Sequence, residues 1–290
     1  MKGIILAGGL GTRLYPLTLT VSKQLLPVYD KPLIYYPLSV LMLADIREIL
    51  IISSARDIPG LQTLLDDGSH LGCVFQYATQ DSPGGIAEAF TIGQSFIDQD
   101  KVALILGDNI FFGSGLGQMI RGYTNPDGAV IFAAQVKDPS RYGVIAWDNA
   151  GRVSGLEEKP TQPSSDFAVP GLYLYDNSVV EIAANVSRSP RGEREITSVN
   201  REYLRQGKLN VVKFNRGIAW LDAGTFESLH DASTFVRVVE ERQSTKIGCI
   251  EEVAFYRKFI HREQLLRLAD RYSASPYGAY LASLSGQDRV

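Results

Sequence analysis

The sequence predicts an α/β fold with a mostly parallel central sheet that is flanked by helices. Two observations lead to this fold class: short apolar runs rich in β-branched residues recur along the first third of the chain, and segments with helical spacing of apolar residues separate them. The runs that predict strands are 2–7, 48–53, 73–78 and 102–106, and the helical segments are 33–44, 61–66 and 86–96. Such alternation is typical of parallel strands joined by right-handed crossovers, with helices on both faces of the sheet.

The first strand runs directly into a glycine-rich segment, residues 8–14, which we call the glycine loop. Its glycines tolerate φ angles that other residues resist, so consecutive N–H groups can point at one phosphate, and Arg13 adds a permanent charge. Leu14 stands where a dinucleotide fingerprint needs its third glycine, and Gly11-Thr12-Arg13 replaces the Gly-Lys-Ser/Thr of a Walker loop. For the loop alone, an ordinary strand-to-helix turn remains an alternative, but its position at a strand's carboxyl end favours a ligand.

Further polar residues are expected at the same edge of the sheet. Prolines prevent a helix through residues 22–32, so we predict a loop that brings Lys23 near the phosphates. A Pro-Gly-Gly turn follows the strand at 73–78, and Gln80, just before this turn, could offer a hydrogen-bond donor and an acceptor to a base. Asp108 follows an apolar strand and is a candidate magnesium ligand. Each of these residues also has a purely structural alternative. Lys23 could be an ordinary solvated lysine, the segment with Gln80 an ordinary turn, and Asp108 a cap of the segment that follows it.

After residue 128 the pattern changes to shorter strands separated by polar turns. Runs at 129–134, 143–147, 152–160 and 167–175 are predicted to be antiparallel or mixed strands inserted beside the parallel sheet. Glu158 and Lys159 end one of these strands, because Pro160 stops the ladder. Asp222 is a second isolated carboxylate after an apolar stretch, and the next segment has one apolar face from Leu229 to Val239, which predicts a helix.

The last fifty residues are predicted to be helical, with segments at 251–259, 262–269 and 277–284. They are rich in aromatic side chains. An appendage of this kind either docks a partner subunit or packs back on its own sheet, and the sequence leaves both open.

Composition places the chain among ordinary globular proteins. Its 290 residues are 45% hydrophobic and 21% charged, which is enough for a full core in one large or two small domains. A net charge of −3 indicates no surface for nucleic acid or membrane. Cys73 and Cys249 lack metal-type spacing to each other or to a histidine, and the chain does not start as a signal peptide does. We therefore expect a soluble, cytoplasmic protein without nucleic-acid or membrane partners.

Eight ordered segments make the chain similar to the glucose-1-phosphate thymidylyltransferases of the sugar-nucleotide pyrophosphorylase family. They are GIILAGGLGTRLYPLT, SKQLLPVYDKPLIYYPLSVLMLA, LGDNIFFG, RYGVI, LEEKP, VPGLYLYD, RGEREIT and AWLDAGT, and they span nearly the whole chain. The resemblance implies a Rossmann-like nucleotidyltransferase fold, similar to glycosyltransferase A, with an inserted mixed-strand sugar-binding region. It also implies a core at 1–242, with nucleotide-binding and sugar-phosphate-binding parts at about 1–128 and 129–225, and a helical region at 243–290 for subunit contact and regulation.

The resemblance also implies two sets of binding residues. The nucleotide set is Leu6, Gly8, Gly9, Gly11, Thr12, Arg13, Gln24, Gln80, Pro83, Gly85 and Asp108. The sugar-phosphate set is Tyr142, Gly143, Glu158, Lys159, Val169, Arg191, Glu195 and Trp220. The implied catalytic residues are Arg13, Lys23, Asp108, Lys159 and Asp222, of which Asp108 and Asp222 would bind Mg²⁺.

The reaction implied by the resemblance joins dTTP and α-D-glucose 1-phosphate into dTDP-glucose and pyrophosphate. This is the first step towards dTDP-rhamnose or another deoxysugar, and the family forms homotetramers. We expect a magnesium-dependent, in-line single displacement, in which Arg13 and Lys23 stabilise the departing pyrophosphate. The attacking phosphate oxygen is already an anion, so no general base is needed, which agrees with the lack of an evident His or Cys nucleophile.

Two rival functions remain open at this stage. A uridylyltransferase would use UTP, which differs from dTTP by one methyl group worth about 1 to 3 kcal/mol. A regulator that binds nucleotide sugars without catalysis is the second, although the presence of both Asp108 and Asp222 speaks against it. A nicotinamide dehydrogenase is disfavoured because the third fingerprint glycine is absent.

The chain also departs from the family pattern. Ser114-Gly115 replaces a common His-Asp, in a region that contributes to a regulatory nucleotide site between subunits in the family. Gly84 stands where an acidic or amide residue is common, and Ile86 where Leu is common. We therefore expect differences in regulation and in the tolerance of the base and sugar pockets.

Overall fold

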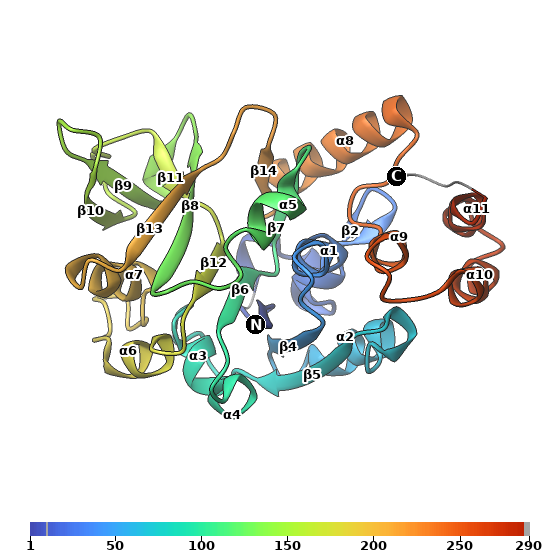
Figure 1. The fold of residues 1–290 in the computed structure, drawn as a ribbon, viewed down its shortest axis with the longest axis horizontal. Coiled ribbons are helices and arrows are strands. Elements are labelled where there is room, and N and C mark those ends of the chain that lie inside the picture. Colours follow the sequence, from blue (N-terminus) through green and yellow to red (C-terminus); the bar gives the residue numbers. More distant parts are fainter. Residues whose placement is uncertain (10, 287–290) are drawn as a thin grey trace.

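A ten-stranded sheet forms the centre of the computed structural model, which describes residues 1–9 and 11–286 (Figure 1). Leu10 of the glycine loop and residues 287–290 of the predicted helical region lie outside the described residues. The strand order is β10-β9-β11-β8-β12-β6-β1-β4-β5, with β13 paired to β8. The strands are β1 Lys2–Leu6, β4 Glu48–Ser53, β5 Val74–Thr79, β6 Val102–Leu106, β8 Ala129–Gln135, β9 Gly143–Trp147, β10 Val153–Glu158, β11 Phe167–Val169, β12 Leu172–Tyr175 and β13 Leu209–Lys213.

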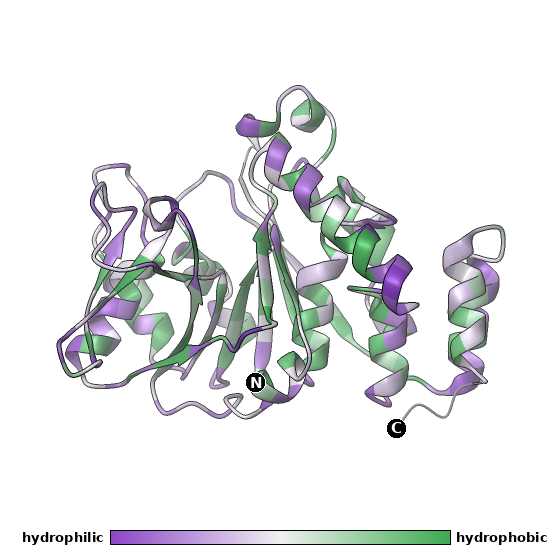
Figure 2. Ribbon diagram, turned by 90° about the horizontal axis from the view of Figure 1, so that it is seen from above, coloured by the Kyte–Doolittle hydropathy of each residue, from purple (hydrophilic) through white to green (hydrophobic). Residues whose placement is uncertain are grey.

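One half of the sheet is parallel. Strand β1 pairs in parallel with β4 and with β6, and β4 pairs in parallel with β5. The strands β1, β4 and β6 are buried along most of their length, because helices cover both faces. Figure 2 shows them as an apolar layer in the middle of the molecule. The predicted α/β fold with a parallel core is therefore confirmed.

The other half of the sheet is mixed. Strand β12 lies antiparallel between β6 and β8, while β13 adds to β8 in parallel. The predicted run at 167–175 divides into β11 and β12 on either side of Pro170 and Gly171. The inserted strands thus continue the same sheet, and the proposed division of the core into two parts stays a prediction.

Eleven α-helices are found among the described residues: α1 Tyr35–Leu43, α2 Ile58–Leu65, α3 Glu88–Ile92, α4 Gln94–Ile97, α5 Leu116–Arg121, α6 Val179–Asn185, α7 Ile196–Arg205, α8 Phe226–Gln243, α9 Ile250–Tyr256, α10 Arg262–Arg271 and α11 Pro276–Leu284. Short 3₁₀ turns lie at Thr12–Leu14, Leu17–Leu19, Lys23–Leu25, Ser69–Leu71 and Pro139–Arg141. The single helix predicted at 86–96 was wrong, because Gly93 separates α3 from α4. A Cβ at Gly93 would lie 3.0 Å from Ile4 of β1, so the helix and strand approach closely there.

Two small strand pairs were missing from the sequence prediction. Strands β2 Pro27–Val28 and β3 Lys31–Pro32 form a short hairpin in the predicted loop. Strands β7 Asn109–Phe112 and β14 Ala219–Asp222 form a second antiparallel pair. Strands this short carry too little periodicity to be recognised.

The C-terminal helices pack back on their own core. Helix α1 is buried on all sides, as expected for a helix that is apolar all round, and it contacts α9 and α5. Apolar residues of α9, α10 and α11 belong to the same core cluster as α1. Among the described residues, no helix combines the length and apolar character needed to cross a membrane.

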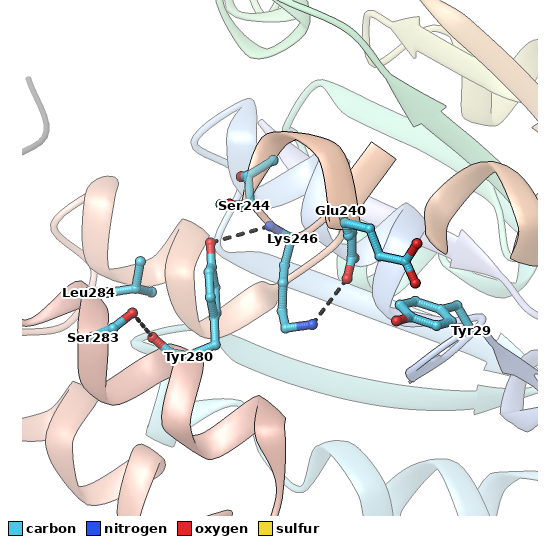
Figure 3. Close-up of a pocket in the computed structure, with 9 residues that line it drawn as sticks. Tyr29, Glu240, Ser244, Lys246, Tyr280, Ser283 and Leu284 are labelled. Carbon is cyan, nitrogen blue, oxygen red and sulfur yellow. Dashed lines mark hydrogen bonds and ion pairs between the residues drawn. The ribbon is translucent and has the colours of Figure 1, made fainter. Parts of the chain in front are cut away.

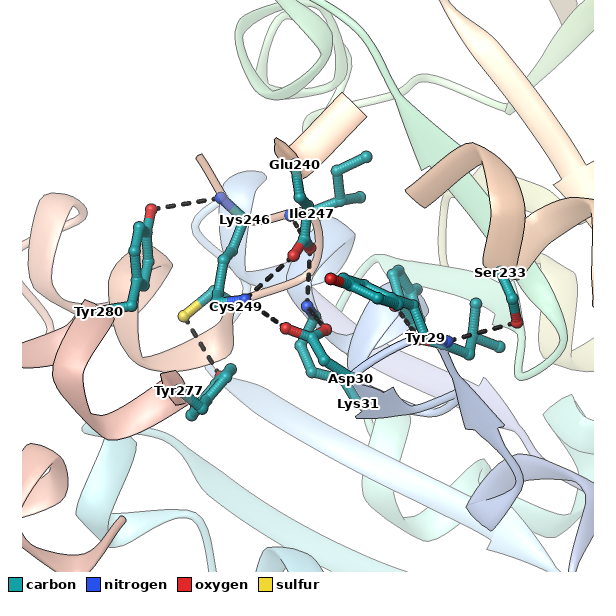
Figure 4. Close-up of polar contacts among 12 residues, drawn as sticks. Tyr29, Asp30, Lys31, Ser233, Glu240, Lys246, Ile247, Cys249, Tyr277 and Tyr280 are labelled. Atoms are coloured by element: carbon teal, nitrogen blue, oxygen red, sulfur yellow. Dashed lines mark hydrogen bonds and ion pairs between the residues drawn. The ribbon is translucent and has the colours of Figure 1, made fainter. Parts of the chain in front are cut away.

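A group of charges with Lys31 and Glu240 buried at its centre joins the C-terminal region to the rest of the chain, and we call Asp30, Lys31, Glu240 and Lys246 the Lys31 cluster (Figure 4). The Lys31 side chain is 1% exposed, and its Nζ lies 2.8 Å from Glu240 Oε1. Lys246 Nζ lies 3.0 Å from Glu240 Oε2, and Asp30 contacts both lysines. Burial acts to raise the pKa of Asp30, but the two lysines outweigh it and hold this pKa below its usual value. The cluster links the β2–β3 hairpin to α8 and to the segment before α9.

Beside this cluster lies a surface cavity of about 380 Å³ (Figure 3). Its walls come from the hairpin, the end of α8 and α11, and include Tyr29, Lys246 and Tyr280. The backbone N–H of Lys246 donates to Tyr280 Oη at 3.3 Å, so α11 is attached to the same segment. The predicted appendage is therefore anchored by charges as well as by apolar packing.

We expect Lys31→Met to destabilise the fold by about 3 kcal/mol, because Glu240 would remain buried with one of its two cations missing. Denaturant unfolding of purified protein measures this change. Arg237→Met is the control, since it breaks a 3.0 Å pair with Glu241 on the exposed face of the same helix. The control should cost about 0.5 kcal/mol or less, and equal losses in the two variants would contradict the prediction.

Candidate functional site

Two cavities meet at the carboxyl ends of β1 and β6. The first, which we call the loop cavity, has a volume of about 430 Å³ and is lined by Leu6, Gly8, Gly9, Gly11, Thr12, Arg13, Lys23, Gln24, Pro83, Ile86, Leu106, Asp108, Glu193 and Gly224. The second, the sheet cavity, measures about 510 Å³ and lies over the mixed strands. Four residues line both cavities: Arg13, Ile86, Leu106 and Asp108. The two spaces therefore share one wall.

The glycine loop forms one side of the loop cavity. Gly9 and Gly11 have φ angles of 98° and 61°, which side chains rarely adopt, so the positions need glycine. The Thr18 hydroxyl donates to Gly11 O at 2.8 Å and fixes the end of the loop. Gly107 N donates to Leu6 O at 2.9 Å and holds the loop next to the segment that carries Asp108.

Asp108 is fixed by two donors on its two oxygens. Lys23 Nζ lies 2.5 Å from Oδ2, and Asn109 Nδ2 donates to Oδ1 at 2.7 Å. Burial acts to raise the pKa of Asp108, but the Lys23 charge and these hydrogen bonds outweigh it, so the pKa lies below its usual value. Strand β7 begins directly after Asp108, so the helix-cap alternative fails. Asp108 is an ionised carboxylate between the two cavities.

Asp222 reaches the same place through the pairing of β14 with β7. It lies opposite Asn109, and Ala223 N donates to Asp108 O at 3.0 Å. Its own oxygens accept from Tyr142 Oη at 2.7 Å and Arg141 Nη2 at 3.1 Å. Burial, followed by the hydrogen bond and charge of Asp222, raises the pKa of Tyr142, so this hydroxyl stays protonated and donates.

The donor set around Asp108 and Asp222 suits a cation that brings other ligands with it. Within residues 1–9 and 11–286, no group of three or more His, Cys, Asp or Glu side chains is arranged to hold a metal. Magnesium bound to a nucleotide needs only one or two protein carboxylates, because phosphate and water oxygens complete its shell. The two aspartates therefore fit a magnesium ion that is bound to a nucleotide.

Cations and carboxylates alternate at the far end of the sheet cavity. Lys159 has a φ of 44°, an unfavourable angle for a side chain, and its side chain is 46% exposed. Arg191 Nη2 lies 2.8 Å from Glu195 Oε1 and 3.4 Å from Glu158 Oε1. The Thr197 hydroxyl also donates to Glu158. This network holds two cationic side chains at the mouth of the cavity.

Most residues predicted from the sequence line these two cavities. Of the predicted nucleotide set, only Gln80 and Gly85 lie outside the lining of the loop cavity, and Gln80 stands directly behind Gly8. Of the predicted sugar-phosphate set, only Glu195 lies outside the lining of the sheet cavity. It is 7% exposed and reaches the cavity through Arg191.

Sequence reasoning missed Asn109, which connects several parts of the site. It is 3% exposed, and its Oδ1 accepts from Gly171 N at 3.0 Å and Trp220 Nε1 at 2.6 Å, while Nδ2 holds Asp108. Its position directly after Asp108 was the available signal. Arg141, which pairs with Asp222, was also missed, because nothing in the sequence distinguishes it from a solvated arginine.

Comparisons with known proteins agree with this arrangement. A family model described as nucleotidyl transferase matches residues 2–238. A glucose-1-phosphate thymidylyltransferase from Mycobacterium tuberculosis is 55% identical over 284 residues, which cover 98% of this chain and 99% of the relative. A solved Bacillus anthracis protein, assigned as a glucose-1-phosphate thymidylyltransferase and bound to sucrose, is 40% identical with a TM-score of 0.76, covering 82% and 95% of the two chains. A UDP-glucose pyrophosphorylase with UDP-glucose is 26% identical with a TM-score of 0.73, covering 82% and 98%.

We expect Lys23→Met to raise the pKa of Asp108, because the substitution removes both the neighbouring charge and a hydrogen bond while burial remains. A carboxyl NMR titration of labelled protein measures the change. Lys2→Met is the control, since it breaks the 3.3 Å pair with Asp100 elsewhere on the sheet and should leave Asp108 unaffected. An unchanged or lower pKa in Lys23→Met would show that Lys23 does not hold the carboxylate ionised.

Proposed function

The chain belongs to the nucleotidyl transferase family, and we propose that it is the enzyme that joins dTTP to α-D-glucose 1-phosphate, with dTDP-glucose and pyrophosphate as products. The observation that carries the proposal is the wall shared by the two cavities, where Arg13 and Asp108 face both spaces. A reaction between two anionic substrates needs such a wall, because their phosphates must approach each other despite repulsion.

In this proposal the triphosphate binds in the loop cavity. The glycine loop offers backbone N–H groups to its phosphates, and Arg13 offers a guanidinium fork. Gln24, Gln80, Pro83 and Gly85 contact the base and ribose. The buried amide groups of Gln24 and Gln80, 3% and 8% exposed, support this role because they are held in fixed positions.

The sugar phosphate binds in the sheet cavity. Lys159 and Arg191 at its mouth supply positive charge for the phosphate group. Glu158, Tyr142, Val169 and the other predicted residues line the space for the hexose, where a carboxylate accepts hydrogen bonds from sugar hydroxyls.

The chemistry is a single displacement. An oxygen of the sugar phosphate attacks the α-phosphorus of dTTP, a new O–P bond forms, and the bond to the bridging oxygen of pyrophosphate breaks. The nucleophile is an anion before it attacks and the leaving group departs as an anion, so no side chain has to move a proton. Arg13 and Lys23 stabilise the charge that develops on the departing pyrophosphate.

We propose that the divalent cation is magnesium and that Asp108 and Asp222 are its protein ligands. When bound, the ion neutralises phosphate charge and polarises the reacting phosphoryl group. Lys23 holds Asp108 in place and keeps its pKa low, and Arg141 orients Asp222 until the substrate arrives.

The finer biological setting also belongs to the proposal. We propose that the protein works in the cytoplasm as a homotetramer and supplies a dTDP-deoxysugar route. The family resemblance is the support for these three statements.

The direct test is pyrophosphate release with magnesium, across dTTP, UTP, CTP and GTP, each with several hexose 1-phosphates. We expect the highest kcat/KM with dTTP and glucose 1-phosphate, because the similar proteins that match nearly the whole chain are named glucose-1-phosphate thymidylyltransferase. No release with either dTTP or UTP would overturn the catalytic proposal. A strong preference for UTP would identify a uridylyltransferase instead.

We expect Asp108→Asn to lower kcat at least about a hundredfold while the protein stays folded, because the change removes a charge that the reaction needs but keeps the size of the side chain and an acceptor oxygen for Lys23. Steady-state kinetics measure kcat, and circular dichroism with thermal unfolding checks the fold. Asp127→Asn is the control, since that side chain is 94% exposed and distant from both cavities. Full activity in a folded Asp108→Asn protein would exclude this residue from the mechanism.

A further inference from the structure

The side chain of Gln80 is held in one orientation by groups that only accept hydrogen bonds. Gln80 follows β5 and is 8% exposed. Its Nε2 donates to Glu88 Oε2 at 2.8 Å and to Gly85 O at 3.4 Å. A carboxylate and a carbonyl have no hydrogen to offer, so the amide nitrogen must face them and Oε1 must face away. The orientation thus follows from chemistry.

The oxygen of this amide lies behind Gly8, a residue of the loop-cavity lining. Gln80 Oε1 lies 2.7 Å from the place that a Cβ on Gly8 would occupy, and Gly8 lines the loop cavity. Because Gly8 has no Cβ, no side chain of that residue separates Oε1 from the loop cavity. A hydrogen-bond acceptor therefore stands directly behind this part of the cavity lining.

Glu88 itself is anchored on its second oxygen. Arg188 Nη2 lies 3.6 Å from Glu88 Oε1, and the Glu88 side chain is 21% exposed. The segment after Arg188 is tied to the same turn, because Arg194 N donates to Gly84 O at 2.7 Å and Ala87 N donates to Arg194 O at 3.1 Å. Glu88 is thus held between the turn at residues 83–85 and the segment that leads into α7.

The carboxylate of Glu88 also fills the space that a side chain at residue 84 would need. A Cβ on Gly84 would lie 2.1 Å from Glu88 Oε2 and 2.3 Å from its Oε1, far inside van der Waals contact. A side chain at residue 84 would therefore require the end of the Glu88 side chain to move from this position. Gly84, which replaces the acidic or amide residue common in the family, thus leaves the space that the Glu88 carboxylate occupies.

We propose that Glu88 is a positioning residue that makes the site select bases with an N–H at ring position 3. Thymine and uracil carry this N–H and can donate it to Gln80 Oε1, whereas cytosine has only a lone pair there. With cytosine, two acceptors would face each other, Gln80 Oε1 and the ring nitrogen at position 3, so cytosine is rejected. Without an anionic acceptor behind it, the Gln80 amide can turn and offer Nε2 to cytosine. This inference rests on the proposed function and adds the source of its base specificity.

The test compares kcat/KM for dTTP, UTP and CTP in wild type and in Glu88→Met, at saturating glucose 1-phosphate. Met keeps the length of the side chain but cannot accept from Gln80. We expect the dTTP to CTP ratio to fall at least about tenfold, because one mismatched hydrogen bond is relieved. The dTTP to UTP ratio should stay unchanged, because both bases carry the N–H. If Glu88 had a merely structural role, the substitution would lower kcat/KM for all three nucleotides by a similar factor.

Two further variants make the outcome decisive. Glu88→Gln keeps one acceptor oxygen without the charge, and we expect about a threefold fall in the dTTP to CTP ratio. Glu263→Met changes an exposed glutamate at the start of α10 and should leave every ratio unchanged. If Glu88→Met does not fold, Glu88→Gln alone decides. Where turnover of CTP is too slow to measure, competitive inhibition constants for CTP and UTP compare the binding of the two bases directly.

An unchanged dTTP to CTP ratio in the folded Glu88 variants overturns the inference, and so does an equal change in the dTTP to UTP ratio. Either result leaves the proposed function intact if wild type releases pyrophosphate from dTTP. Absence of that release in wild type would instead overturn the proposed function itself. The two failures are therefore distinguishable in one data set.

Discussion

The antiparallel pairing of β7 with β14 is the constraint on which the candidate site depends. It places Asp222 opposite Asn109 and lets Ala223 N donate to Asp108 O at 3.0 Å, although these residues lie far apart in the sequence. Asn109 extends the connection to Trp220 and Gly171 through its side chain. One short strand pair thus joins the carboxyl end of the parallel sheet to the sheet cavity, and a shift of its register by one residue would turn Asp222 away.

Charge is balanced unevenly across the shared wall, and this imbalance indicates where an anion binds. Lys23 is neutralised by Asp108, and Arg191 by Glu195. Arg13 lines both cavities but forms no ion pair with any described residue, although its Nη1 would lie 3.8 Å from a Cβ on Gly224. Paired cations hold their carboxylate partners in place, whereas a cation without a partner supplies net attraction for a phosphate. Arg13 is therefore the group with most charge available for a ligand.

The sequence allowed the parallel core to be predicted because β1, β4 and β6 are largely continuous apolar runs that bury both faces, while β5 at the edge of the sheet is partly exposed. The strand at 102–106 was located to the residue, and Asp108 followed from it. Pairings such as β7 with β14 depend on contacts between distant residues, which local periodicity does not contain. Asn109 escaped notice for the same reason, because its importance lies in three partners from three segments. The family resemblance supplied most of the remaining site residues, and composition alone supplied none.

Gly84 illustrates why a departure from a family pattern cannot be interpreted one position at a time. Taken alone, a glycine at residue 84, in the turn at residues 83–85, suggests a looser pocket for the base. In the structure the vacated space is filled by the Glu88 carboxylate, which lies too close for any Cβ at residue 84. An acidic side chain at both positions would add like-charge repulsion in a partly buried turn. Residue 84 therefore has to be interpreted together with residue 88, because the Glu88 carboxylate beside Gly84 is also the group that accepts from Gln80 Nε2.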